Sequence, residues 1–295
     1  METDLTVIIP TYNNLEGLQY LLNYFKDKEF KVIVVGNGLD PRLRGDDTGN
    51  LVYLPQEKNL GFAGGVNKGA KDVKTKWMLI LNDDIRFDKK ITNNKSQITN
   101  EYQILNNKKI KQNPIESLIK YAEENNLDAV SPILKNPNGE VENYGYKVLP
   151  YGKVELIKEN YRLDPRLRED DNASIDGLTA ACLLVKTEVF KKLGGFDESF
   201  FAYLEDVDFF LRMKKMDSRL RGNDKLSFGI AYDIEVIHNH MTTSLTMGNF
   251  KAKQDMINWW RLYFKHPEKF KFNLDFIIER MRNVSGFVKA TFYSI

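Results

Sequence analysis

Two acidic runs in this sequence have the residue types and spacing that metal binding and proton transfer require. The first, Leu79–Ile85, is an apolar segment that ends in Asn82, Asp83 and Asp84. Carboxylates at the end of a buried strand are hard oxygen ligands, which suit Mg²⁺ or Mn²⁺ together with nucleotide phosphates. The structural alternative is that these acids simply begin a loop.

The second acidic run comprises Glu205, Asp206 and Asp208, which stand among Phe and Tyr residues. Acids favour the N-terminus of a helix on dipole grounds alone, so a structural role is one interpretation. A carboxylate walled by aromatic side chains also has a raised pKa, which suits a general base. Both interpretations place this run at the start of a helix.

Two further motifs precede the acidic ones. Val7–Asn14 is an apolar strand that opens onto polar residues, which could equally cap a helix. Glu57–Gly69 is glycine-rich but is no Walker loop, because Lys68 is followed by Gly69. Its glycines allow a ligand to approach the backbone where a helix begins, a position that favours phosphate.

Short β-branched runs alternate with helical stretches along the first half of the chain. The pattern predicts an open, mostly parallel, doubly wound α/β sheet with helices on both faces. Ligands bind such sheets beyond the carboxyl ends of the strands, where polar clusters stand at 11–14, 37–40 and 82–84. The predicted strands are 5–10, 31–36, 51–54, 77–82 and 129–134, and the predicted helices are 15–26, 63–73 and 114–125.

Two kinds of insertion interrupt this pattern. Residues 89–113 hold six Asn, six Lys and three Gln, a composition that buries little surface and predicts a polar loop. A nine-residue repeat occurs at 39–47, 163–171 and 216–224. The irregular spacing excludes a solenoid. The copies read either as a translated mobile element tolerated in surface loops or as basic loops that grip phosphate.

Charge and cysteine content narrow the class of protein. Forty-three Lys and Arg against forty-one Asp and Glu are too balanced for a general nucleic-acid binder, so no nucleic-acid partner is expected. Cys182 lies in an apolar run and is expected to be a buried, inert thiol. The opening residues do not form a signal peptide, and the apolar runs are shorter than the roughly 18–20 residues of a membrane helix. We therefore expect a cytoplasmic protein.

The last segment of the chain differs from the rest. Residues 250–295 carry nine Lys and Arg against four Asp and Glu, a net charge of +5. Trp259 and Trp260 in this segment could stack on an acceptor sugar or pack in a core. The basic, aromatic character also motivates the hypothesis of peripheral contact with an anionic membrane at the inner face of the cell. We expect a main domain over 1–248 and a helical extension over 249–295.

Taken together and in order, the four motifs resemble the family 2 glycosyltransferases, in particular their bacterial rhamnosyltransferase-like branch with the GT-A fold. The resemblance runs from about Leu5 to His240. It implies that Asp84 is a metal ligand and that Asp206 is the catalytic base beside Glu205. It also implies a nucleotide-sugar pocket built from Pro10, Thr11, Tyr12, Asn13, Asn37, Asn59, Gly61, Gly64, Asn67, Asn82 and Asp83.

The resemblance implies a second metal ligand as well, because the family places a His after a late strand. Ile234–His240 offers His238 and His240, and His238 follows the apolar alternation better. One departure concerns the second strand, where the family carries an Asp that contacts the nucleobase. Gly36 stands in that place, so Asn37 or Asp40 would have to substitute, or the enzyme is weakened or inactive.

The activity expected from this resemblance is that of an inverting hexosyltransferase dependent on Mg²⁺ or Mn²⁺. It would move a sugar from a nucleoside-diphosphate donor, dTDP-rhamnose or a UDP-sugar, to a hydroxyl of a glycan or lipid-linked acceptor in cell-surface polysaccharide synthesis. The alternative is a catalytically inactive protein of the same fold that binds nucleotide sugars or acts as a scaffold. A glycoside hydrolase is disfavoured, because its two carboxylates need no nucleotide pocket.

Overall fold

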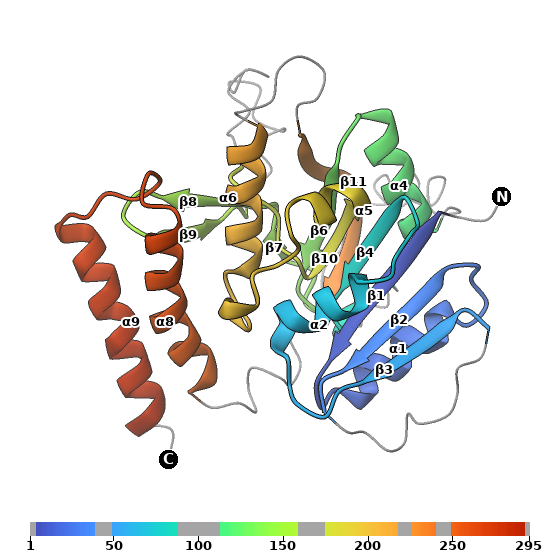
Figure 1. Ribbon diagram of the computed structural model, residues 1–295, viewed down its shortest axis with the longest axis horizontal. Helices are drawn as coiled ribbons and strands as arrows, with labels where there is room; N and C mark the ends of the chain where they lie inside the picture. The colour runs from blue at the N-terminus through green and yellow to red at the C-terminus, as the bar shows by residue number, and fades with distance from the viewer. Residues whose placement is uncertain are drawn as a thin grey trace.

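The computed structural model describes residues 4–38, 49–87, 113–158, 175–217, 226–239 and 249–292. Its centre is a nine-stranded sheet in the order β3-β2-β1-β4-β10-β6-β11-β5, with β7 paired to β6 (Figure 1). The strands are β1 (Leu5–Thr11), β2 (Lys31–Gly36), β3 (Leu51–Pro55), β4 (Trp77–Leu81), β5 (Ile85–Arg86), β6 (Ala129–Lys135), β7 (Val141–Asn143), β10 (Cys182–Lys186) and β11 (Phe228–His238).

The first four strands of the sheet form its parallel half. β1 pairs in parallel with β2 on one side and with β4 on the other, and β2 pairs in parallel with β3. All seven residues of β1 are buried, as expected for a strand covered on both faces. The strand order reverses direction at β1, so the sheet has a topological switch point beside the carboxyl end of this strand.

The second half of the sheet is less parallel than the sequence pattern predicts. β10 runs antiparallel to both β4 and β6, and β5 runs antiparallel to β11. An apolar run such as that of β10 fits a buried strand of either direction, because hydrophobicity carries no information about strand polarity. The sheet is therefore mixed, while the half made of β3, β2, β1 and β4 keeps the expected parallel order.

Helices cover both faces of the sheet, as the sequence predicts. One core joins alternate sheet residues to α2, α5 and α6, and the other joins the intervening residues to α1 and α4. The sequence places the helix starts locally, since Asn14 caps α1 by accepting a hydrogen bond from Gly17 N at 3.0 Å. The helices are α1 (Leu15–Phe25), α2 (Gly61–Ala70), α4 (Pro114–Glu124), α5 (Thr187–Lys192) and α6 (Glu205–Asp217), with a short 3₁₀ helix η4 (Glu198–Phe200).

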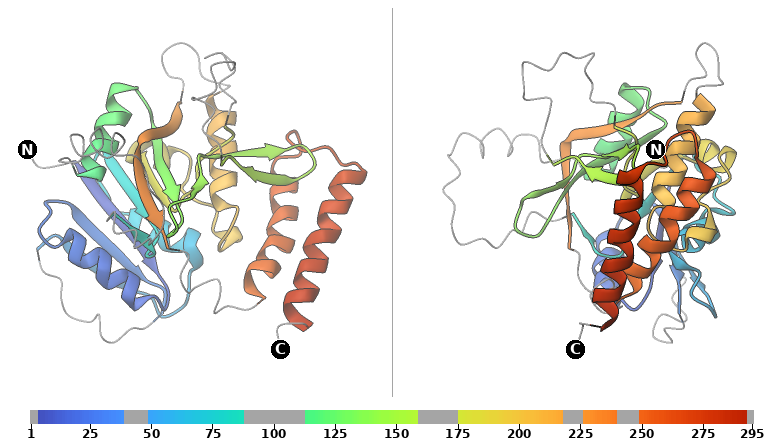
Figure 2. Two further views of the ribbon diagram at one scale, coloured as in Figure 1. Left: turned by 180° about the vertical axis from the view of Figure 1, so that it is seen from behind. Right: turned by 90° about the vertical axis from the view of Figure 1, so that its left-hand side faces the viewer.

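A helical hairpin ends the described chain. Its helices α8 (Phe250–Lys265) and α9 (Leu274–Phe292) lie side by side beyond α6, and the β8–β9 hairpin reaches them from the main sheet (Figures 1 and 2). β8 spans Tyr146–Leu149 and β9 spans Lys153–Leu156. A third core of aromatic and aliphatic side chains joins η4, α6 and β8 to the two helices. None of the described helices is long and apolar enough to cross a membrane.

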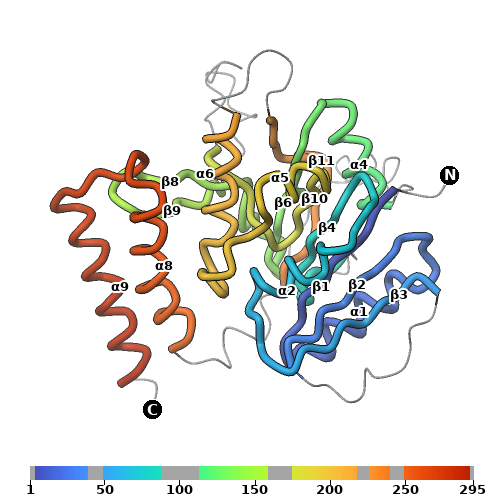
Figure 3. Tube along the Cα trace, viewed as in Figure 1, coloured from blue at the N-terminus to red at the C-terminus, as the bar shows by residue number. Residues whose placement is uncertain are grey.

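The predicted insertions fall almost entirely outside the described residues. The repeat copies at 39–47 and 163–171 lie there completely, and the copy at 216–224 shares only its first two residues with the end of α6. Of the polar insert at 89–113, the structure describes Asn113, which caps α4. The described elements can be followed along the chain in Figure 3, from β1 to α9. The functional interpretation of the insertions stays a prediction.

Candidate active site

One cavity of about 580 Å³ collects most of the predicted site residues. It lies at the carboxyl ends of β1, β2 and β4 and extends to α8 and α9. Residues of the sheet and of the α8–α9 hairpin therefore line the same cavity. The predicted residues that line it are Pro10, Thr11, Tyr12, Asn37, Asn59, Gly61, Asn82, Asp83, Asp84, Glu205, Asp206, His238 and Trp259. Asn13, Gly64, Asn67 and Trp260 are not among its lining residues.

Asp83 fixes the turn that follows β1. Its carboxylate accepts hydrogen bonds from Thr11 Oγ1 at 2.6 Å and from Asn14 Nδ2 at 2.9 Å. Burial raises the pKa of Asp83 to about 6, although these hydrogen bonds oppose the rise. Both carboxylate oxygens are thus engaged in holding the turn between β1 and α1. The neighbouring Asp84 is left to face the cavity.

The glycine-rich segment is tied to the end of β2 by Asn37. Its side-chain amide donates to Gly61 O at 2.8 Å and its side-chain oxygen accepts from Leu60 N at 3.2 Å. Gly61 has φ +72°, and a Cβ there would stand 2.3 Å from Phe201 O. Only glycine fits this close approach. Gly61 N donates to Asn59 Oδ1 at 2.8 Å and Ala63 N donates to Phe201 O at 3.1 Å, so the start of α2 is packed against the loop at Phe201 while Asn59 and Gly61 line the cavity.

Gly36 has a structural explanation. A Cβ on this residue would stand 2.2 Å from the hydroxyl oxygen of Tyr53, so the Tyr53 side chain from β3 occupies the space of the missing side chain. Asn37 beside it lines the cavity, whereas Asp40 lies outside the described residues. Gly36 and Tyr53 are thus matched to each other, and restoring an acid at position 36 would require Tyr53 to move.

Asp84 and His238 are in contact with each other, and both line the cavity. His238 Nε2 lies 3.3 Å from Asp84 Oδ1, and His238 Nδ1 lies 3.0 Å from Glu142 Oε2. Burial alone would lower the pKa of His238, but its contacts with the two carboxylates raise it to about 9. The imidazole of β11 therefore joins the acidic turn after β4 to Glu142 of β7. His240 lies outside the described residues.

The spacing of this pair fits a divalent cation. Two ligands of one cation, each bonded at about 2.1 Å, stand about 3 Å apart in octahedral geometry. Mg²⁺ and Mn²⁺ are commonly held by one or two protein ligands, with water and substrate phosphates completing the shell. Within the described ranges, no group of three or more His, Cys, Asp and Glu side chains is arranged to hold a metal. The separation of Asp84 and His238 is thus compatible with two ligands of one cation, provided that the imidazole gives up its proton.

Glu205 and Asp206 begin α6 and line the same cavity. Both are buried, and burial raises the pKa of Asp206 to about 6. Burial and the neighbouring charge of Asp206 raise the pKa of Glu205 well above its ordinary value. Asp206 accepts hydrogen bonds from Val207 N at 2.8 Å and Ala180 N at 3.3 Å. Burial thus favours the protonated form of both carboxyls, and the negative charge of Asp206 raises the pKa of Glu205 further.

The loop that precedes Glu205 has a strained backbone and is held in place by hydrogen bonds from α8. Phe201, Tyr203 and Leu204 all have positive φ, a conformation that is costly for non-glycine residues. Asn258 of α8 is fully buried, and its amide donates to the carbonyls of Phe200, Ala202 and Tyr203 at 2.8–3.0 Å. The helical hairpin thus holds the loop before Glu205 in its unusual shape.

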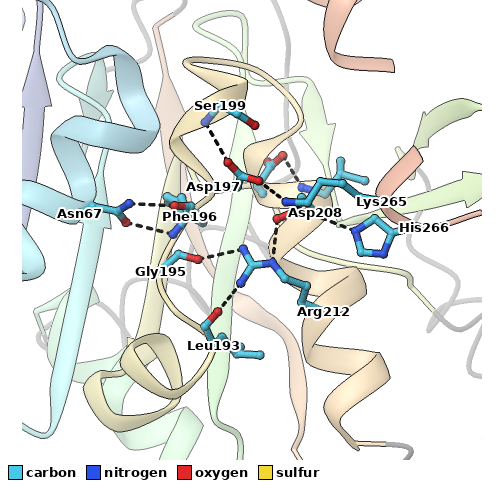
Figure 4. A network of polar contacts seen from close by, with 12 residues as sticks. Asn67, Leu193, Gly195, Phe196, Asp197, Ser199, Asp208, Arg212, Lys265 and His266 are labelled. Carbon is cyan, nitrogen blue, oxygen red and sulfur yellow. Dashed lines mark hydrogen bonds and ion pairs between the residues drawn. The ribbon is translucent and has the colours of Figure 1, made fainter. Parts of the chain in front are cut away.

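A polar network behind this loop anchors α6 (Figure 4). Asp208 is fully buried and contacts Arg212 Nε at 2.7 Å, His266 Nε2 at 2.9 Å and Lys265 Nζ at 3.2 Å. Burial would raise its pKa, but these partners hold the pKa of Asp208 below its ordinary value. Asn67 belongs to this support, because its side-chain amide bonds both N–H and C=O of Phe196.

Several residues at the site carry no signal in the sequence. Glu142 lies in a polar stretch without pattern, and Asn258 is one amide within an amphipathic helix. Of the two tryptophans, Trp259 is buried and lines the cavity, whereas Trp260 is 37% exposed and stacks on Phe264. Cys182 is buried, as predicted, and burial raises the pKa of its thiol to about 12.

Sequence comparisons agree with this arrangement. Residues 6–92, from β1 through the acidic turn after β4, match the model of glycosyl transferase family 2. Over 250 residues the chain is 25% identical to the low-salt glycan biosynthesis hexosyltransferase Agl10 of Haloferax volcanii, with 81% of this chain and 68% of that protein covered. It is 24% identical over 244 residues to an N-acetylglucosaminyl-diphospho-decaprenol L-rhamnosyltransferase of Mycobacterium tuberculosis, covering 72% of this chain and 70% of that one.

Solved structures share the fold. The mannosyltransferase PcManGT of Pyrobaculum calidifontis, in complex with GDP-Man and Mn²⁺, aligns over 99% of this chain and 74% of its own, with TM-score 0.55 and 13% identity. GalNAc-T7, with UDP, GalNAc and Mn²⁺, has the same TM-score and identity and covers 96% of this chain and 55% of its own. The chain therefore has the GT-A fold, and its residues 6–92 are similar in sequence to glycosyl transferase family 2.

Proposed function

We propose that this protein is a metal-dependent, inverting hexosyltransferase that moves a sugar from a nucleoside-diphosphate donor to an acceptor hydroxyl. The observation that carries the proposal is the single cavity in which the Asp84–His238 pair and the buried Asp206 carboxylate both stand. One side offers ligands for a cation next to phosphate, and the other offers a base. No nucleophilic side chain is required for such a displacement.

The donor half of the site would bind the nucleotide through the polar ends of β1 and β2 and the cavity-lining residues Asn59 and Gly61. Asp84 and His238 would hold Mg²⁺ or Mn²⁺, which neutralises the negative charge that develops on the departing diphosphate. Glu142 would orient the His238 ring through Nδ1, as carboxylates behind metal-binding histidines do. Asp83 would act indirectly, by holding the turn that carries Thr11.

Asp206 would take the proton from the attacking acceptor hydroxyl. A pKa of about 6 leaves it ionised near neutral pH yet more basic than an exposed aspartate, which suits a general base. Attack on the face opposite to the leaving diphosphate inverts the anomeric centre in one displacement. Glu205, protonated beside it, would keep the charge of the pair at one.

For the donor we propose dTDP-rhamnose, with UDP-sugars as the next choice, and for the acceptor a glycan or lipid-linked sugar in cell-surface polysaccharide synthesis. The names of the two relatives support this class, since one is a hexosyltransferase of glycan biosynthesis and the other transfers L-rhamnose to a diphospho-decaprenol-linked sugar. Both solved neighbours carry a nucleotide and Mn²⁺, which supports the proposed cofactor.

Equilibrium binding tests this proposal against the inactive alternative suggested by Gly36. Calorimetric titration with dTDP-, UDP- and GDP-sugars should detect binding of one nucleotide class that requires Mn²⁺ or Mg²⁺ and disappears with chelator. An enzyme would also release the nucleoside diphosphate slowly from that donor, whereas an inactive protein would bind it unchanged. Absence of binding by folded protein to every donor would contradict the enzyme and favour an inactive scaffold protein of the same fold.

A surface of α9 supports the proposal of peripheral membrane contact. Its exposed apolar side chains recur three or four residues apart, opposite the face that packs on α8. Arg282 and Lys289 lie along one edge of this stripe, and the 250–295 segment is basic overall. Apolar stripes with basic edges bind the interface of anionic bilayers. The stripe consists of Leu274, Ile277, Ile278, Met281, Val284, Val288 and Phe292.

We expect the double variant Met281→Glu/Val288→Glu to bind vesicles of phosphatidylglycerol and phosphatidylcholine at least about tenfold more weakly than the wild type, because it places charges in the apolar stripe. Vesicle co-sedimentation at low salt measures this. Lys120→Glu on α4 is the matched control, since it makes the same change in net charge at a surface far from α9. Equal binding by the wild type and the double variant would contradict the membrane contact.

A further inference from the structure

Arg280 is a buried cation at the acceptor end of the cavity. It lies on α9, is only 6% exposed and lines the cavity. Its Nη2 donates a hydrogen bond to Gly152 O at 2.5 Å. The guanidinium also lies over the rings of Trp259 and Phe276, with its carbon 4.5 Å and 4.9 Å from their centroids. The side chain is therefore fixed by packing rather than by a carboxylate.

The guanidinium has donors that nothing in the described part of the chain accepts. Nε and Nη1 are buried and have no hydrogen-bond partner there. Asp255 and Glu279 are the nearby acids, and neither forms an ion pair with Arg280 within 4.0 Å. A buried charge with unsatisfied donors costs free energy unless a ligand supplies acceptors. Burial lowers the pKa of Arg280 to about 10, so the group remains charged at neutral pH.

The turn between β8 and β9 is shaped around this group. Gly152 has φ +73°, and a Cβ there would stand 2.9 Å from both Nη1 of Arg280 and the ring of Phe276. A larger residue would displace the guanidinium. The neighbouring Lys153 also lines the cavity, which adds a second cation at this end. The pocket wall thus leaves room for Arg280 in one defined position.

We propose that Arg280 binds a phosphate group carried by the acceptor substrate. This inference rests on the proposed function, which assigns the sheet end of the cavity to the donor and leaves the α8–α9 end for the acceptor. A guanidinium presents several N–H groups in a plane, which matches the oxygens of phosphate. The same helix carries the apolar stripe on its outer face. A phosphate bound at Arg280 would thus lie on the inner face of the helix whose outer face carries this stripe.

The test uses phenyl phosphate as the probe, titrated calorimetrically into protein whose donor site is already filled with Mg²⁺ and the nucleoside diphosphate that binds best. We expect Arg280→Gln to weaken phenyl phosphate binding at least about tenfold, because it removes a charge-assisted hydrogen bond. Nucleotide affinity should change less than about twofold. Arg282→Gln, an exposed arginine on the same helix, is the matched control and should leave both affinities unchanged.

Gly152→Ala provides a second route to the same result, because it displaces the guanidinium without removing its charge. Thermal unfolding of each variant verifies that it is folded. Equal binding of phenyl phosphate to Arg280→Gln and wild type would overturn the proposal, and so would a benzoate affinity as high as that for phenyl phosphate. Loss of nucleotide binding in Arg280→Gln would instead assign the residue to the donor diphosphate. Failure of the wild type to bind any nucleotide would count against the proposed function alone, since phenyl phosphate can then be titrated without it.

Discussion

Replacing Asp206 by Asn should lower kcat by about 10²–10⁴-fold while leaving donor affinity nearly unchanged. The expected loss is the usual contribution of a positioned general base. Asn is almost isosteric but cannot accept the proton of the acceptor hydroxyl. Stability should be unchanged or slightly higher near pH 8, because the pKa of Asp206 is raised on folding and its buried charge opposes folding above about pH 6. Steady-state kinetics and thermal unfolding measure the two effects.

Asp208→Asn is the matched control for this prediction, since it makes the same change two residues along α6. Asp208 is outside the cavity lining and holds Arg212, Lys265 and His266. Its loss should lower the free energy of unfolding by about 3 kcal/mol, as when one partner of a buried ion pair is removed.

Wild-type kcat should fall as pH decreases through about 6, where Asp206 gains a proton. An unchanged kcat in Asp206→Asn would remove this residue from the chemistry.

His238→Ala should weaken Mn²⁺ binding by more than about 100-fold in the presence of nucleoside diphosphate, with a parallel rise in the Mn²⁺ concentration that activity requires. The reason is that even the loss of a residue that only orients a metal-binding histidine costs about 10–100-fold. Glu142→Gln, which disturbs the Nδ1 contact of His238, should show that smaller effect. Electron paramagnetic resonance of free Mn²⁺ measures both.

His266→Ala is the control for the metal prediction. His266 is also buried and also contacts a carboxylate, but it is not among the cavity-lining residues. Its loss should leave the Mn²⁺ titration unchanged and lower only stability. A Mn²⁺ titration of His238→Ala that matches the wild type would mean that the Asp84–His238 pair does not hold the cation.

The fold was largely predictable because its signals are local. The predicted strand 31–36 coincides with β2, and the predicted helix 114–125 matches α4 to within one residue. Apolar runs and caps such as Asn14 and Asn113 are encoded by neighbours in the sequence. The antiparallel direction of β10 and the β8–β9 hairpin were not predictable in this way, because strand polarity and pairing depend on distant segments.

Some residues of the candidate site could likewise be predicted from local motifs, and others could not. The motif at the end of β4 led to Asp84, since ligands bind beyond the carboxyl ends of parallel strands. The acidic run among aromatic residues at the start of α6 led to Asp206. Glu142, Asn258 and Arg280 came only with the structure, because each acts through a partner that is remote in the sequence. For Asn67, the sequence predicted a ligand contact because the residue lies in the glycine-rich motif. In the structure the side-chain amide of Asn67 forms hydrogen bonds with the backbone of Phe196.

Turnover of sugar nucleotides tests the central claim most directly. Wild-type protein and Asp84→Ala would each be incubated with dTDP-rhamnose, UDP-sugars and GDP-mannose in the presence of Mn²⁺, Mg²⁺ or chelator, and the released nucleoside diphosphate would be quantified. The account predicts metal-dependent release from one donor class by the wild type and its loss in Asp84→Ala. Release that persists in chelator, or an Asp84→Ala variant as active as the wild type, would contradict it.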